Sequence, residues 1–194
     1  MAHKIEFANR HGLRSEWRQQ HLDPAAFWRR AGLTAGGTAL DIGAGTGFFA
    51  IPATEIVGSA GRVLAVDTSL EMLAELASFV PLELADRLDR IQSEEYRIPL
   101  DSGVADVALL AFVTHEVDEP ARLLTEATRL IKPGGHILVL DWDPDVEPPP
   151  GPPTEVRLAA DAAAEALGAA GATLLARGVP APGVYELLAR RAGG

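Results

Sequence analysis

Short apolar runs and amphipathic segments alternate along most of this chain. Four apolar runs have the length of buried strands: residues 38–42, 62–66, 105–112 and 136–142. Residues 88–92 predict a further short strand, the third in chain order. Helical patterns lie between them, at residues 48–57, 69–80 and 118–131. Ser69 suits the N-cap of the second helix, for which we expect an apolar face of Leu70, Leu73, Ala77 and Val80. Strands joined by helices in this way predict a parallel sheet.

The alternation continues at both ends of the chain. Asp23 and Pro24 predict the start of a short helix that ends at Gly32. After residue 142, an alanine-rich helix ends near Gly171, and strands follow at residues 173–177 and 184–189. We therefore expect an α/β protein with one doubly wound, mostly parallel, Rossmann-like sheet and N-terminal helices. Ligands of such sheets bind beyond the carboxyl ends of the strands.

The turn after the first strand is rich in glycine, in the stretch ALDIGAGTGFFA at residues 39–50. A triphosphate-binding loop needs lysine and then serine or threonine after its last glycine, but Phe48 and Phe49 stand there. The dinucleotide fingerprint needs a glycine three positions after Gly45, where this chain has Phe48. The triphosphate site is thereby excluded, whereas a dinucleotide site with a relaxed fingerprint stays open.

Two acidic residues narrow the choice of ligand. Asp41 ends the first strand, where a carboxylate would repel a pyrophosphate and attract an ammonium or sulfonium group. Asp67 ends the second strand, 20 positions past Gly47, and a carboxylate there can accept hydrogen bonds from two ribose hydroxyls. The expected ligand thus carries a ribose and a positive charge but no phosphate. S-adenosylmethionine has these properties.

Composition and charge restrict the partners. The chain has a formal net charge of −10, from 27 acidic and 17 basic residues, which disfavours nucleic acid. Arginines cluster near the N-terminus, at Arg10, Arg14, Arg18, Arg29 and Arg30, and we expect them on a solvated helical face. The absence of cysteine, of a membrane-length apolar run and of an apolar leader core fits a cytoplasmic protein without a membrane partner.

From residue 38 to residue 142 the chain resembles the class I S-adenosylmethionine-dependent methyltransferases that act on small molecules. LDIGAGTG is similar to the first motif of that family and VLAVDTSLEML to the second. SEEYRIPLDSGVADVALL resembles the motif on the adenine side, and RLIKPGGHILVLDW resembles the late turn and fifth strand. Four such motifs in the proper order and spacing are far more specific than one glycine-rich turn.

The resemblance implies roles for particular residues. Asp41 would orient the methionine amino group, and the backbone of Gly43, Ala44, Gly45 and Gly47 would pass beneath the methionine moiety. Asp67, with Thr68 beside it, would hold the ribose. Glu94 would contact the adenine amino group, with Glu95 as the second choice, and Phe112 would stand near the methyl group.

The resemblance also implies a division of the single domain, residues 1–194. Residues 1–33 would form a helical lid and residues 34–142 the cofactor-binding core. Residues 143–194 would contain a loop, the last helix and the last strands. Five prolines between residues 148 and 153 exclude a helix or a central strand in that loop.

Residues of the acceptor site are harder to assign. His115 follows the fourth strand, where it is the candidate general base, because the pKa of histidine lies near neutrality. The same side chain could instead line the cavity or bond to backbone. We expect no metal site, because His115, Asp141 and Asp143 show no metal-ligand spacing.

The expected function is methyl transfer from S-adenosylmethionine to a small molecule by in-line displacement. Catalysis of this kind depends mainly on alignment and on the exclusion of water. A non-catalytic S-adenosylmethionine-binding subunit would carry the same binding residues, and a nicotinamide-dependent oxidoreductase is a weaker alternative. The sequence indicates neither the acceptor nor the oligomeric state.

Overall fold

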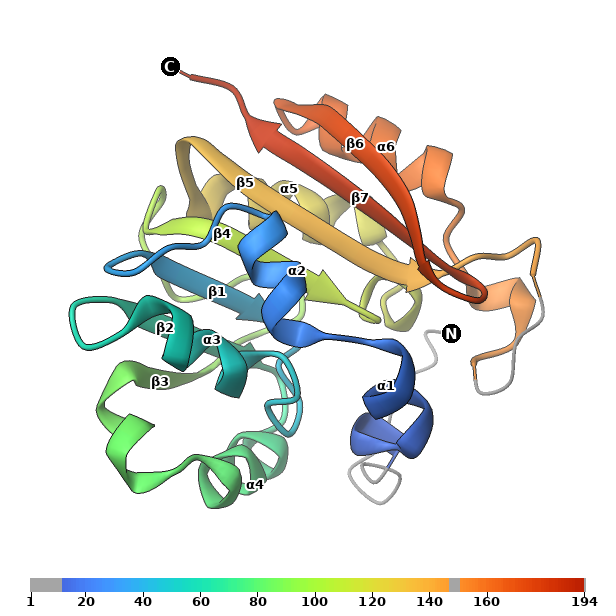
Figure 1. The fold of residues 1–194 in the computed structure, drawn as a ribbon. Helices are drawn as coiled ribbons and strands as arrows, with labels where there is room; N and C mark the ends of the chain where they lie inside the picture. The colour runs from blue at the N-terminus through green and yellow to red at the C-terminus, as the bar shows by residue number, and fades with distance from the viewer. Residues whose placement is uncertain (1–11, 147–150, 194) are drawn as a thin grey trace.

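The computed structural model describes residues 12–146 and 151–193. Within these ranges the chain forms one seven-stranded sheet with the strand order β3-β2-β1-β4-β5-β7-β6 (Figure 1). Its strands are β1 Thr38–Ile42, β2 Arg62–Asp67, β3 Leu88–Gln92, β4 Ala105–Ala111, β5 Ile131–Trp142, β6 Ala172–Ala181 and β7 Val184–Arg191. The predicted doubly wound, mostly parallel sheet is confirmed. Residues 1–11 of the expected lid, with Arg10, and residues 147–150 of the proline-rich loop lie outside the described residues.

Helices connect the strands as the sequence pattern predicts. The α-helices are α1 Glu16–His21, α2 Pro24–Arg30, α3 Ala50–Val57, α4 Leu70–Phe79, α5 Pro120–Leu130 and α6 Ala160–Ala169. Short 3-10 helices add η2 Leu82–Arg87, η3 Thr114–Glu116 and η4 Thr154–Val156. Asp23 caps α2 by accepting a hydrogen bond from the Ala26 N–H, and Ser69 caps α4 by accepting one from the Met72 N–H.

The strand order reverses between β1 and β4. The five strands β1 to β5 all run parallel to one another. Strand β7 runs antiparallel to its two neighbours, β5 and β6. A two-residue connection between β6 and β7 leaves room only for an antiparallel pair. The carboxyl ends of β1 and β4 therefore open at the switch point, where α/β sheets bind their ligands.

Two apolar layers cover the sheet. On one face, α2 and α3 bury Phe27, Trp28 and Ala53 against alternate strand residues. On the other face, α5 and α6 bury Leu124 and Leu167. Figure 1 shows the sheet between these two helical layers. Successive residues of a strand face opposite sides, so Ala39 and Asp41 belong to the α3 side, whereas Leu40 and Ile42 face α5.

Some details differ from the sequence-based expectation. The α4 face that packs on the protein is Met72, Leu73 and Leu76, whereas Leu70 is 58% exposed because it occupies the first turn beside the cap. The late turn expected in RLIKPGGHILVLDW, at Pro133, Gly134 and Gly135, is a bulge within β5. Pairing with β4 jumps there from Ala105↔Ile131 to Val107↔His136, so the extra residues of β5 loop out.

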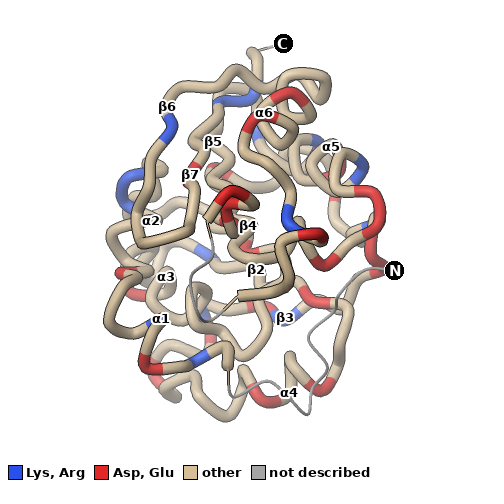
Figure 2. Tube along the Cα trace, turned by 90° about the vertical axis from the view of Figure 1, so that its right-hand side faces the viewer, with Lys and Arg blue, Asp and Glu red and all other residues tan. Residues whose placement is uncertain are grey.

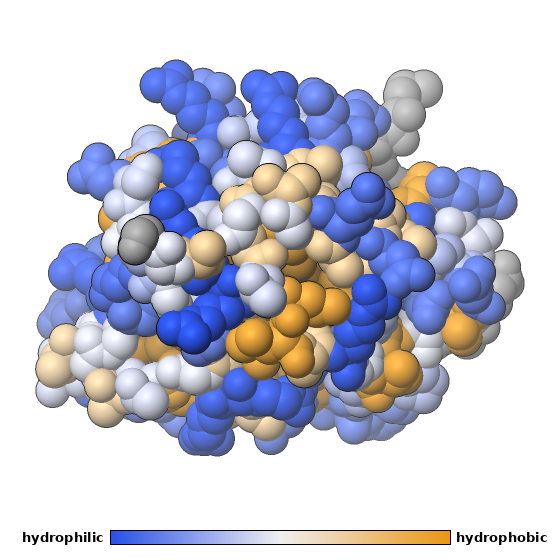
Figure 3. Space-filling model, turned by 90° about the horizontal axis from the view of Figure 1, so that it is seen from above, coloured by the Kyte–Doolittle hydropathy of each residue, from blue (hydrophilic) through white to orange (hydrophobic). Residues whose placement is uncertain are grey.

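The surface carries more acidic than basic groups. Acidic positions lie along α4, α5 and α6 in the side view of Figure 2. Seen from above, the molecule is mostly hydrophilic, with a hydrophobic patch near the centre of that face (Figure 3). Among the residues that the structure describes, no helix is long and apolar enough to cross a bilayer.

Candidate active site

A pocket lies at the carboxyl ends of β1, β2 and β4 and encloses about 970 Å³, including the open space at its mouth. The loops after these strands supply most of its wall, as expected at the switch point. Its lining includes Leu13, Arg18, Gly43, Ala44, Gly45, Thr46, Phe48, Asp67, Thr68, Met72, Ser93, Glu95, Ile98, Phe112, Val113 and Glu116. Of the site residues predicted from the sequence, Gly43, Ala44, Gly45, Asp67, Thr68 and Phe112 are therefore brought together here.

The glycine turn forms the floor of the pocket. Gly43 has a φ of 74° and Gly45 a φ of 52°, in the left-handed region that residues with a Cβ avoid. A Cβ at Gly43 would lie 2.5 Å from Val113 Cγ2. The Gly43 and Ala44 N–H groups donate to the Val66 carbonyl oxygen at 2.8 and 2.9 Å, which binds the turn to the end of β2. Gly47 closes the turn outside the pocket lining.

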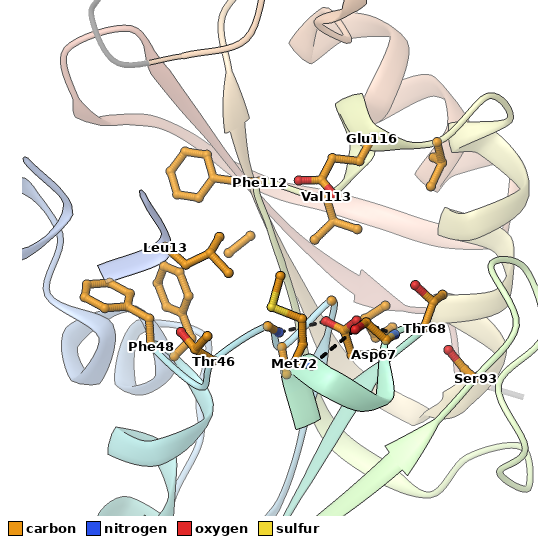
Figure 4. A pocket seen from close by; sticks show the side chains of 18 of the residues that line it. Leu13, Thr46, Phe48, Asp67, Thr68, Met72, Ser93, Phe112, Val113 and Glu116 are labelled. Atoms are coloured by element: carbon orange, nitrogen blue, oxygen red, sulfur yellow. Dashed lines mark hydrogen bonds between the residues drawn. The ribbon is translucent and has the colours of Figure 1, made fainter. Parts of the chain in front are cut away.

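Asp67 joins the first two loops. Its Oδ2 accepts from the Gly45 N–H at 2.8 Å and its Oδ1 from the Ser69 N–H at 2.9 Å (dashed in Figure 4). A carboxylate oxygen can accept more than one hydrogen bond. The side chain lies beside Thr68 and lines the pocket. This geometry suits a ligand with adjacent hydroxyl groups.

Asp41 lies beneath the pocket and is absent from its lining. It is 2% exposed, and its Oδ2 has no hydrogen-bond partner among the described residues. Burial, with a smaller effect of the Asp67 charge, raises the pKa of Asp41 to about 8, and the Ala50 N–H at the start of α3 partly offsets this. An orphaned, buried acceptor directly under a ligand turn favours a cationic or hydrogen-bond-donating ligand above it.

Glu94 does not line the pocket, although both of its neighbours, Ser93 and Glu95, do. The Glu94 N–H donates to the Arg97 carbonyl at 3.1 Å, and these two residues form an isolated antiparallel bridge. Glu95 and Tyr96 form the turn between the two bridge residues, and in this turn Glu95, not Glu94, reaches the cavity wall. The predicted adenine-side segment thus reaches the pocket, but through Ser93 and Glu95 and not through Glu94.

The opposite end of the pocket is apolar. Figure 4 places Phe112, Leu13 and Phe48 there, away from Asp67, Thr68 and Ser93. Phe112 has a φ of 60°, which is unusual for a side chain of this size and costs about 1–3 kcal/mol. Contact with Trp142, whose ring centroid lies 5.0 Å away, holds it in place. Aromatic groups around one end exclude water from that part of the cavity.

His115 lies behind the pocket wall. It is 5% exposed, and its Nδ1 lies 2.6 Å from Asp141 Oδ1, whereas its Nε2 lies 3.8 Å from Glu116 Oε1. Burial alone lowers the pKa of His115, but Asp141 and, more weakly, Glu116 outweigh it and raise that pKa above its ordinary value. Glu116 lines the cavity, into which it projects in Figure 4, whereas His115 does not.

Asp141 fixes this histidine firmly. Its Oδ2 also accepts from the Thr114 N–H and hydroxyl at 2.9 and 2.5 Å, and its Oδ1 from the Trp142 N–H at 2.8 Å. The carboxylate is fully buried and surrounded by donors, so it holds η3 against the end of β5. The described part of the chain contains no group of three or more His, Asp or Glu side chains that could hold a metal ion.

Sequence reasoning missed Arg18. The arginine cluster was expected on a solvated face, but Arg18 is only 9% exposed and lines the pocket. Trp17 contacts Trp142, with ring centroids 5.1 Å apart, and this contact docks α1 over the apolar end. A helix of six residues with one tryptophan, Trp17, gives no periodic signal of burial, so only the fold reveals that Arg18 is buried.

Comparison with known proteins agrees with this geometry. Residues 40–139 match the family described as "Methyltransferase domain". The ubiquinone/menaquinone biosynthesis C-methyltransferase UbiE of Hahella chejuensis is 26% identical over 71% of this chain and 53% of its own length. The demethylmenaquinone methyltransferase of Oceanobacillus iheyensis is 30% identical over 58% and 48%. The chain thus spans about half the length of these curated relatives.

Solved structures extend the likeness over nearly the whole chain. A SAM-dependent methyltransferase from Aquifex aeolicus superposes with a TM-score of 0.87 at 28% identity, covering 96% of this chain and 99% of its own. The [4+2]-cyclase SpnF shares the fold, with a TM-score of 0.74 at 20% identity over 88% and 81% of the two chains. The family match, the sheet order and the switch-point pocket lead to one conclusion. The chain belongs to the methyltransferase domain family and has the class I S-adenosylmethionine-dependent methyltransferase fold.

Proposed function

We propose that this protein transfers a methyl group from S-adenosylmethionine to a small-molecule acceptor. The observation that carries the proposal is a single pocket with a polar end at Asp67 and an apolar end at Phe112. A nucleoside needs the first and a methyl group shielded from water needs the second. The description of the matching family, "Methyltransferase domain", also names methyl transfer.

The residues present fit the cofactor. The Asp67 carboxylate lines the pocket beside Thr68, where a carboxylate suits ribose hydroxyls, and the turn from Gly43 to Gly47 leaves backbone close to the cavity. For the adenine contact we propose Ser93 and Glu95 in place of Glu94. The orphaned Oδ2 of Asp41 fits an ammonium group above the turn, reached through a water molecule because Asp41 itself lies beneath the wall.

When bound, the cofactor supplies an electrophilic methyl group on a positively charged sulfur. The chain's own residues then have three tasks. The turn and Asp67 fix the nucleoside, Phe112 and Phe48 keep water away from the apolar end, and the wall aligns the acceptor. Leu13 and Arg18 from the N-terminal segment complete that wall, which supports the lid proposed for residues up to 33.

For proton removal from the acceptor we propose Glu116, with His115 as the residue that positions it. Glu116 faces the cavity, and His115 Nε2 lies 3.8 Å from its carboxylate while Asp141 holds Nδ1. We expect Glu116→Gln to lower kcat with unchanged cofactor affinity, and His115→Gln to shift the pH profile of kcat. An unchanged profile in His115→Gln would remove histidine from this role.

The acceptor is proposed only as a class. Relatives named for quinone methylation support a small organic molecule, and the net charge of −10 argues against nucleic acid. We also propose a cytoplasmic location, supported by the cysteine-free sequence.

Calorimetry of the purified protein tests cofactor binding, with S-adenosylhomocysteine against NADH. We expect binding of the first and none of the second; the reverse result would favour a nicotinamide-dependent oxidoreductase. Transfer of label from methyl-labelled S-adenosylmethionine into a metabolite extract tests catalysis. Binding without any transfer would favour a non-catalytic subunit, and the cyclase SpnF shows that this fold serves more than one reaction.

A further inference from the structure

Arg18 brings a cation into the apolar end of the pocket. Its side chain is among the pocket-lining groups although the residue is only 9% exposed. The guanidinium carbon lies 4.6 Å from the centre of the Phe112 ring, in a cation–π contact. Trp17, the preceding residue, packs on Trp142, so the helix that carries Arg18 is fixed on the body of the protein.

Within the described residues, no hydrogen bond or ion pair engages the Arg18 guanidinium. Arg14, which precedes α1, differs: its guanidinium donates to the Thr46 carbonyl at 2.8 Å and to the Thr46 hydroxyl at 3.3 Å. Arg30 pairs with Glu186. A guanidinium has five N–H donors, and leaving them unmet in a buried place is costly. Arg18 thus lacks an acceptor among the residues that the structure describes.

Two carboxylates, those of Glu116 and Asp141, act on the positive charge of Arg18. Burial lowers the pKa of Arg18 to about 10, against the opposing influence of Glu116 and Asp141, so the side chain remains a cation at neutral pH. Asp141 is occupied by His115, Thr114 and Trp142. Glu116 contributes a negative charge to the wall, which makes a singly charged ligand group more favourable there than a doubly charged one.

We propose that Arg18 binds a carboxylate of the methyl acceptor, whose apolar body lies against Phe112 and Phe48. A planar guanidinium and a carboxylate form two parallel hydrogen bonds, and the surrounding aromatic rings suit an apolar body. The substrate class is therefore a small organic acid with an aromatic or aliphatic frame. This assignment rests on the proposed function, because it places the acceptor at the end opposite Asp67.

Matched probes test the assignment directly. Binding of benzoate, benzamide and phenyl phosphate is measured by NMR titration, with and without S-adenosylhomocysteine. We expect benzoate to bind about tenfold or more tightly than benzamide. The preference should disappear in Arg18→Met, persist in part in Arg18→Lys, and be intact in Arg29→Met, which removes an exposed guanidinium from α2. Circular dichroism establishes that each variant is folded.

Each contrary result has a definite meaning. Equal affinity for benzoate and benzamide, absence of binding by both, or a preference that survives in Arg18→Met would overturn the carboxylate site. Tighter binding of phenyl phosphate than of benzoate would overturn the choice of carboxylate. Failure of S-adenosylhomocysteine to bind would count against the proposed function instead, and the titrations without it would still decide on Arg18.

Discussion

The Asp67 carboxylate accepts a hydrogen bond of 2.8 Å from the backbone N–H of Gly45, 22 residues earlier in the chain. Its second oxygen accepts from Ser69, at the cap of α4. One side chain thus fixes the distance between the glycine turn and the end of β2 before any ligand enters. A ligand held by Asp67 meets a site that is already organised, which reduces the entropic cost of binding.

Replacement of Asp67 by asparagine tests this double role. The amide presents N–H groups where the Gly45 or Ser69 N–H group requires an acceptor, so one of the two backbone bonds is lost. We expect a loss of about 1–3 kcal/mol in unfolding free energy and a fall of about tenfold or more in S-adenosylhomocysteine affinity. Chemical denaturation and calorimetry measure the two effects. Asp86→Asn, at an exposed position of η2, is the control, and equal affinities in both variants would exclude Asp67 from binding.

Gly43 should tolerate no side chain. Gly43→Ala adds a Cβ 2.5 Å from Val113 Cγ2 at a φ of 74°, and we expect it to lose about 1–3 kcal/mol of stability. The double variant Gly43→Ala/Val113→Ala should recover the part due to the clash and retain the part due to φ. Gly168→Ala in α6 meets nothing within 4 Å and should gain up to about 1 kcal/mol. Equal melting temperatures for the two alanine variants would contradict this geometry.

The raised pKa of Asp41 should make the free energy of unfolding decrease as the pH rises. Its folded pKa of about 8 lies above the unfolded value of about 4, so the folded state binds the extra proton between these limits. The resulting stability is complete below about pH 4 and is lost as pH rises through about 8. Asp41→Asn keeps the side chain neutral. When the pH is raised from 5 to 9, the unfolding free energy of this variant, measured by urea denaturation, should fall by at least about 1 kcal/mol less than that of the parent. If the unfolding free energies of the two proteins change with pH in the same way, the pKa of Asp41 is not raised.

His115 should add a second pH-dependent contribution. Because its pKa is raised in the folded state, the stability it provides is complete below about pH 6.5 and is lost as pH rises through the folded pKa. His115→Gln should therefore remove the part of the decline that begins above about pH 6.5 and leave the part below it. Denaturation series at half-unit pH steps separate the two. The same decline in both proteins would show that the pKa of His115 is not raised in the folded state.

The sequence predicts the architecture well because each strand and cap is specified by local residues. β1 and β3 have the predicted bounds, and Asp23 and Ser69 cap the predicted helices. Local pattern does not determine which of two adjacent side chains turns inward, so Glu94 was chosen where Ser93 and Glu95 line the wall. Arg18 was missed for a different reason, since its burial depends on Trp142, more than a hundred residues away along the chain.

The two ends of the pocket come from different stretches of the chain. The proposed cofactor contacts lie between residues 41 and 95. Arg18, the cation proposed to bind the acceptor, comes from α1, which packs on Phe112 after β4 and on Trp142 at the end of β5. Selection, or an engineer, could thus exchange α1 to change the acceptor and keep the nucleoside half intact. A chimera with the α1 of a relative would inherit that relative's acceptor preference together with this protein's affinity for the cofactor.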